Sequence, residues 1–84
     1  MIKTKVPITL SKCDDIKDFV NIMNKYDFDI DLKKHGTRYM VDAKSLLGVM
    51  SIDTSKDCEI HIFCEDDEDI TLSYLLTEIE KYRR

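Results

Sequence analysis

Ser45 is the side chain best placed for chemistry in this sequence, because it stands immediately before the short apolar run at residues 46–50. A serine at the start of a helix accepts a hydrogen bond from a backbone N–H and acts as an N-cap. The same hydroxyl can carry a phosphate, since a negative group at a helix N-terminus is favoured by ~0.3–1 kcal/mol. The residues alone leave both interpretations open, a structural cap and a phosphorylation site.

The two histidines of the chain are poor candidates for acid–base or phosphate-carrying chemistry. His35 lies in the segment 34–37, which predicts a hairpin turn and an exposed side chain. His61 lies in an alternating segment, so we expect a surface histidine on the strand face opposite Cys58 and Ile62. Neither histidine lies near an expected helix start.

The three cysteines indicate buried packing rather than redox or metal chemistry. Cys58 and Cys64 share one extended segment and are separated by ~20 Å at ~3.3 Å per residue, whereas a disulfide needs Cα atoms within ~7 Å. Both are expected to be small buried hydrophobic side chains. Cys13 is followed by Asp14 and Asp15, which disfavour a reactive thiolate.

The composition predicts one compact domain covering residues 1–84, with a net charge of −4. No basic stripe favours nucleic acid, no apolar run approaches the ~20 residues of a membrane span, and no leader is recognisable. We therefore expect a cytosolic protein that contacts neither nucleic acid nor membrane. The carboxylates at residues 65–69 lack the spacing of a calcium loop, so neither a metal nor a cofactor is expected.

The elements that must position these side chains begin with a strand and a helix. Pro7 argues for an edge position of the first strand or for an irregularity within it, because proline donates no hydrogen bond to a sheet. Ser11, with Asp14 three residues later, predicts the N-cap of the first helix. Apolar residues at helical spacing predict its buried face: Ile16, Phe19, Val20 and Met23.

A hairpin follows the first helix. Apolar residues alternating with aspartates at positions 27–32 predict a half-buried strand with carboxylates on its solvent face. Gly36 can adopt positive φ in the turn, and residues 38–42 return as the second strand. A short helix over residues 45–51 comes next.

The C-terminal part predicts a further strand at residues 58–64 and a last helix after the acidic run. Leucines and one isoleucine define the apolar face of that helix, and basic residues are expected at its end: Lys81, Arg83 and Arg84. The predicted order, β-α-β-β-α-β-α, indicates an α+β fold with a four-stranded antiparallel sheet and three helices on one face. A ferredoxin-like split βαβ arrangement is the alternative.

Residues 41–52, reading Val-Asp-Ala-Lys-Ser-Leu-Leu-Gly-Val-Met-Ser-Ile, resemble the regulatory-serine segment of the HPr family. HPr is the small phosphocarrier protein of the bacterial phosphoenolpyruvate:sugar phosphotransferase system. Residues 25–30 and 56–60 support the resemblance, which spans nearly the whole chain and implies the HPr-like open-faced β-sandwich. Against the family pattern, the hairpin is about two residues longer around Tyr39 and Met40.

The resemblance places the carrier-histidine position of the family on Lys12, its arginine position on Asp14 and its proline position on Asp15. Only about 0.04% of an ordinary lysine is free amine at pH 7, and adjacent carboxylates repel a phosphoryl group. The resemblance therefore implies a variant without histidine-carrier chemistry, similar in that respect to the Crh class of HPr paralogues.

The resemblance also implies that Ser45 is the serine phosphorylated by an ATP-dependent kinase. Lys44, Leu46, Leu47 and Met50 match the partner-binding segment, and we expect at least two of the three apolar side chains to be exposed. The implied partners are the HPr serine kinase/phosphorylase and a transcriptional regulator or another phosphotransferase-system component. The expected function is that of a monomeric regulatory binding module rather than an enzyme. A phosphocarrier with an unconventional acceptor residue, or a phosphorylation-independent scaffold, is the alternative.

Overall fold

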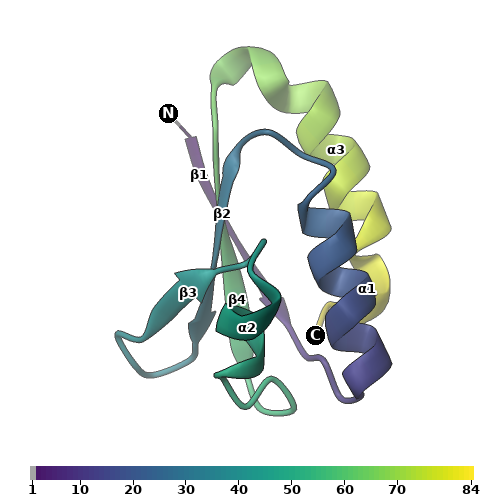
Figure 1. Ribbon diagram of the computed structural model, residues 1–84. Helices are drawn as coiled ribbons and strands as arrows, with labels where there is room; N and C mark the ends of the chain where they lie inside the picture. Colours follow the sequence, from purple (N-terminus) through teal and green to yellow (C-terminus); the bar gives the residue numbers. More distant parts are fainter. Residues whose placement is uncertain (1) are drawn as a thin grey trace.

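The computed structural model describes residues 2–84, with side chains described from Thr4 onward. A four-stranded sheet is covered by helices on one face (Figure 1). In chain order the elements are β1 (Ile2–Ile8), α1 (Cys13–Met23), β2 (Asp29–Lys34), β3 (Met40–Asp42), α2 (Leu46–Met50), β4 (Cys58–Cys64) and α3 (Asp69–Glu78), with short 3-10 turns η1 (Asp66–Glu68) and η2 (Glu80–Tyr82) on either side of α3. The expected α+β order and the four-stranded antiparallel sheet are confirmed.

The strand order is β1-β4-β2-β3, and each neighbouring pair is antiparallel. This order decides against the ferredoxin-like alternative, in which the first strand lies inside the sheet. Pro7 therefore lies on an edge strand, as its missing N–H predicts. Gly36 adopts the positive φ of 79° that the hairpin turn requires.

The core lies between the sheet and the helices, where one face of β4 carries Cys58, Ile60, Ile62 and Cys64, all buried. Phe19 and Met23 of α1 and Leu75 of α3 are fully buried against that core. The long helices α1 and α3 lie side by side in Figure 1, and α2 lies across the lower part of the sheet. Within residues 2–84 no helix has the length and apolarity required to cross a membrane.

Two element boundaries differ from the predictions. α1 begins at Cys13 with Lys12 at the N-cap, so Ser11 is not the cap, and no side chain caps this helix. Leu10 is held instead by the loop before β4: its N–H donates to the Thr54 carbonyl at 2.8 Å, and its own carbonyl accepts from the Thr54 hydroxyl at 3.0 Å. These tertiary bonds keep the chain extended for longer than the local capping pattern indicates.

The chain end also departs from the prediction. α3 stops at Glu78, and the last residues turn back to the sheet, where Arg83 forms an isolated bridge with Ile8. The Arg84 guanidinium donates to the carbonyls of Ile8 and Cys58, at 3.2 and 2.7 Å. Arg83 and Arg84 therefore hold the C-terminus against β1 and β4, and all three basic residues lie beyond the last turn of α3.

Candidate functional site

Ser45 is the N-cap of α2, and its side chain is half-buried. Its Oγ accepts a hydrogen bond from the Gly48 N–H at 3.1 Å, and its carbonyl accepts from the Val49 N–H at 2.9 Å. A Cβ on Gly48 would lie 3.3 Å from both Cβ and Oγ of Ser45, so the glycine leaves room for this cap. The structural interpretation of Ser45 as a helix cap is confirmed.

The segment that leads into Ser45 is joined to the turn after α1 by several hydrogen bonds. Asp42 accepts from the backbone N–H of Lys44 at 2.9 Å, and the Lys44 ammonium donates to the Tyr26 carbonyl at 2.5 Å. Asn24 donates to the Lys44 carbonyl at 3.0 Å. The turn after α1 therefore fixes where α2 begins, and the Lys44 ammonium faces that turn.

The turn after α1 is itself anchored to α3. Glu78 accepts from the Lys25 ammonium at 2.8 Å and from the Tyr26 hydroxyl. Burial, together with the Glu78 carboxylate, raises the pKa of Tyr26 to about 12. The hydrogen bonds from Lys25 and Tyr26 hold the pKa of Glu78 below its usual value.

The apolar side chains of α2 are exposed: Leu46 to 38%, Leu47 to 82% and Met50 to 57%. Leu46 and Met50 line a pocket of about 210 Å³ with Cys13, Ile16 and Lys17 of α1. We call this the α1–α2 groove. We expected at least two of these three side chains to be exposed, and all three are. Val49 is the residue of α2 that is buried in the core.

Lys12, the position matched to the carrier histidine, is exposed and directly precedes Cys13 at the edge of the α1–α2 groove. Of the two carboxylates that we expected beside the carrier position, Asp15 is half-buried in the first turn of α1, and neither Asp14 nor Asp15 lines the α1–α2 groove. Asp14 is exposed in the first turn.

His61 corrects a prediction, because it is 2% exposed rather than a surface residue. β4 is an inner strand, and His61 lies between its register partners Lys5 on β1 and Asp31 on β2. Its Nε2 contacts Glu59 Oε1 at 2.8 Å, which holds the pKa of Glu59 below its usual value. His35 is exposed in the hairpin turn, as predicted.

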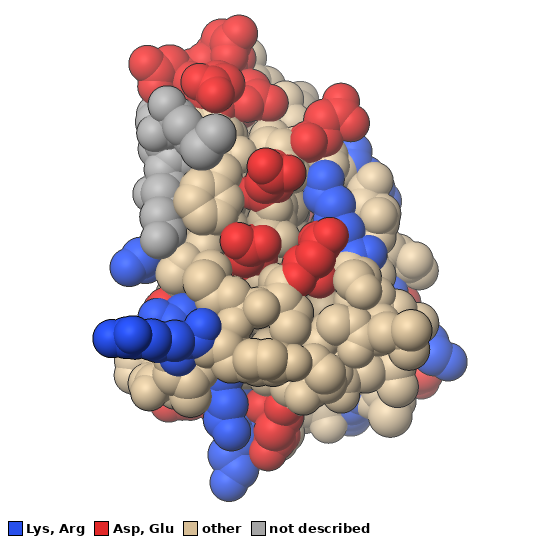
Figure 2. Space-filling view, turned by 60° about the vertical axis from the view of Figure 1, so that its left-hand side comes forward, with Lys and Arg blue, Asp and Glu red and all other residues tan. Residues whose placement is uncertain are grey.

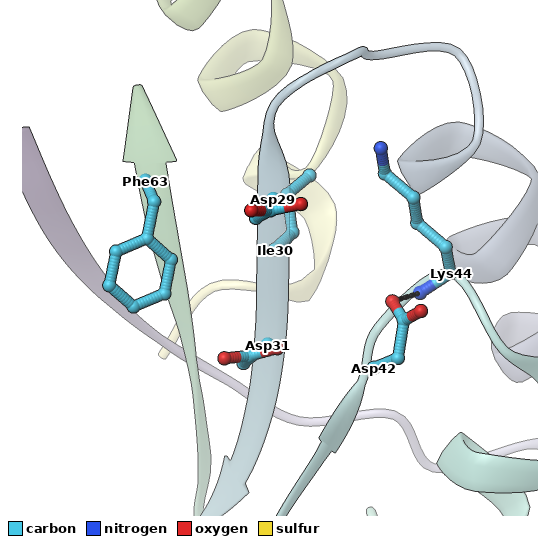
Figure 3. A pocket seen from close by; sticks show the side chains of 6 residues that line it. All are labelled: Asp29, Ile30, Asp31, Asp42, Lys44 and Phe63. Carbon is cyan, nitrogen blue, oxygen red and sulfur yellow. Dashed lines mark hydrogen bonds between the residues drawn. The ribbon is translucent and has the colours of Figure 1, made fainter. Parts of the chain in front are cut away.

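A second pocket, of about 360 Å³, lies on the uncovered face of the sheet (Figure 3). Asp29 and Asp31 of β2, Asp42 of β3 and Phe63 of β4 line it together with Lys44, whose side chain extends away from Asp42. Three carboxylates repel a phosphate. Among the described residues no group of three or more His, Cys, Asp or Glu side chains is arranged to hold a metal ion.

Comparisons with known proteins agree with this geometry. A family model described as the PTS HPr component phosphorylation site matches residues 15–81, so Lys12 and Asp14 precede the matched range. The crystal structure of HPr-C-His from Thermoanaerobacter tengcongensis is 25% identical, with a TM-score of 0.64, and the match covers 94% of this chain and 93% of that one.

A crystal structure of the phosphocarrier protein HPr from Bacillus anthracis str. Ames is 29% identical, with a TM-score of 0.61 over 88% of this chain and 90% of that one. These structures share the open-faced sandwich of sheet and helices described above. Since the family model also spans most of the sequence, the chain belongs to the HPr family of phosphocarrier-type proteins of the phosphotransferase system.

Proposed function

We propose that this protein is a regulatory, protein-binding member of the HPr family that is phosphorylated on Ser45 and does not carry phosphate on a histidine. The observation that carries the proposal is the position of Ser45. Its hydroxyl begins α2 directly beside the exposed side chains of Leu46, Leu47 and Met50. A modification of this hydroxyl changes the charge at the edge of a surface that is suited to a protein partner.

The chemistry fits a hydroxyl at this place. A kinase transfers the γ-phosphoryl group of ATP to the Ser45 oxygen, the hydroxyl proton leaves to a base of the kinase, and ADP departs. The phosphate adds about 1.5 to 2 negative charges. We expect the N-terminal end of α2 to tolerate this charge, because the Gly48 N–H already donates to the Ser45 oxygen and negative groups are favoured at helix N-termini.

Histidine-carrier chemistry has no support from the two histidines. His35 lies in the hairpin turn, and His61 is buried with Nε2 engaged by Glu59. Lys12, at the position matched to the carrier, is a poor phosphoryl acceptor at neutral pH. The loss of carrier function therefore rests on the residue types as well as on their placement.

The partners proposed for the surface are the HPr serine kinase/phosphorylase and a transcriptional regulator or another phosphotransferase-system component. The α1–α2 groove offers them an apolar contact between two helices, with Leu47 projecting beside it. Lys44 supports this surface indirectly, since its ammonium is bonded to the Tyr26 carbonyl and fixes the start of α2.

The test is intact-mass measurement after two incubations, one with phosphoenolpyruvate and Enzyme I, the other with ATP and the HPr serine kinase. We expect one added phosphate in the second tube alone, lost in Ser45→Ala and retained in Ser51→Ala, a matched control at the C-cap of the same helix. A phosphate added in the first tube would establish a carrier with an unconventional acceptor. No phosphate in either tube would favour a phosphorylation-independent scaffold.

A further inference from the structure

A third pocket lies at the end of the sheet where the β2–β3 turn meets the loop before β4. Lys34 and His35 line one side, and Ser55, Lys56 and Asp57 line the other, around an open volume of about 500 Å³. The His35 N–H donates to the Asp57 carbonyl at 3.0 Å and joins the two sides. This pocket shares no residue with the α1–α2 groove.

The carboxylates at this pocket are already engaged. Asp57 forms an ion pair with Arg84 at 2.9 Å. Asp53, next to the pocket, accepts from both the N–H and the hydroxyl of Ser55, at 3.2 and 2.6 Å. These bonds hold the pKa of Asp53 below its usual value, and the charges of Lys56 and Lys34 lower it further.

The cations are not engaged in the same way. Across the described part of the chain, the side chains of Lys34, His35 and Lys56 form no ion pair and no side-chain hydrogen bond. The chain carries a net charge of −4, and on the face shown in Figure 2 most acidic side chains lie in the upper half, although acidic side chains also lie beside basic ones at the bottom. A locally positive pocket is therefore not a general property of this surface.

We propose that this pocket binds a small, water-soluble phosphate monoester, whose dianionic phosphate lies between the ammonium groups of Lys34 and Lys56 with His35 as a further donor. A compact dianion matches two separate point-charge donors. The volume leaves room for an organic group of the size of a sugar beside the phosphate. Because the pocket is open and its cations are solvated, the expected dissociation constant is on the order of 1 mM at low salt.

The experiment is a titration followed by amide NMR shifts, with inorganic phosphate, with glucose 6-phosphate and with glucose as the uncharged control. We expect saturable shifts that centre on residues 34–36 and 55–57 with both phosphates and none with glucose. Lys34→Met and Lys56→Met should each weaken binding at least fivefold, since about fivefold is the value of a pair of unit charges at ~4 Å in water and the phosphate carries two. Lys5→Met, at an exposed position of β1, makes the same charge change outside the pocket and should leave the affinity unchanged.

The ion pair of Asp57 with Arg84 allows a test in which a substitution should strengthen phosphate binding instead of weakening it. Asp57→Asn removes a negative charge from the pocket and leaves the Arg84 charge without its carboxylate partner, so it should tighten phosphate binding at least fivefold. Asp27→Asn, an exposed position outside the pocket, is the charge-matched control and should have no effect. The assignment is overturned by scattered, non-saturating shifts, by Lys and Asp variants that bind like their controls, or by binding only to phosphatidic acid vesicles. Each variant is checked for the dispersed spectrum of the folded protein.

Discussion

Replacing Ser45 by alanine should lower the free energy of unfolding by about 1 kcal/mol, within the range of ~0.5–2 kcal/mol measured for N-caps. The magnitude follows from one hydrogen bond, the 3.1 Å contact from the Gly48 N–H to the Ser45 Oγ. α2 spans only Leu46–Met50, so its first turn is most of the helix and neighbouring turns cannot compensate. In a domain of 84 residues this loss corresponds to a decrease in Tm of about 4–8 °C.

The variant Ser45→Asp distinguishes the loss of the helix cap from the effect of a negative charge at this position. A carboxylate accepts the same N–H and is favoured at a helix N-terminus, so this variant should lose less than half as much stability as Ser45→Ala. Urea unfolding followed by far-UV circular dichroism suits a chain that has no tryptophan. Ser73→Ala is the control, because Ser73 is exposed in α3 and bonds only to the preceding turn.

The prediction fails if Ser45→Ala and Ser73→Ala unfold at the same urea concentration, since the cap would then contribute nothing measurable. It also fails if Ser45→Asp is as unstable as Ser45→Ala. The second result would mean that the start of α2 does not accept negative charge, and it would count against phosphorylation that preserves the fold.

Two further predictions concern titratable side chains. The pKa of Tyr26 is raised to about 12 in the folded protein. The stability that this tyrosine contributes is therefore present below pH 10 and should be lost between about pH 10 and 12, because the phenol ionises at lower pH in the unfolded chain than in the folded one. In urea titrations at pH 9 and 11.5, Tyr26→Phe should lose less stability between the two pH values than the unmodified protein. Tyr74→Phe, at an exposed position, should lose as much as the unmodified protein. An equal loss of stability in all three proteins would contradict the assignment. In thiol titration of the native protein with Ellman's reagent, Cys13 should react rapidly while Cys58 and Cys64 react only after unfolding, because they are 1% exposed and burial raises the pKa of both thiols. Rapid modification of a second thiol would show that the sheet opens under native conditions.

Much of the fold follows from local patterns. Alternation over residues 58–64 predicted the strand and its buried face, and the missing N–H of Pro7 predicted an edge strand. Ser45 before an apolar run predicted both the start of α2 and its cap. These features depend on residues that are neighbours in the chain, so the sequence carries them directly.

The errors arise where distant segments compete with local preferences. Ser11 has the residue type of a cap, but bonds between Leu10 and Thr54 hold the chain extended past it. His61 alternates like a surface residue, but its strand lies between two others and neighbouring side chains cover it. Neither outcome has a signal within a window of a few residues.

The features of the candidate sites likewise fall into those that local patterns predict and those that depend on the tertiary structure. Periodicity and capping, which act over one or two turns, determined the order of elements, the apolar side chains of α2 and the hydroxyl that precedes them. The tertiary structure alone decided that β4 lies inside the sheet, that Leu10 is bonded to Thr54, and that Arg84 returns to Asp57 beside Lys34 and Lys56. Strand order and charge pairing bring together residues that are far apart in the chain, and the spacing of side chains along the sequence does not encode which of them meet.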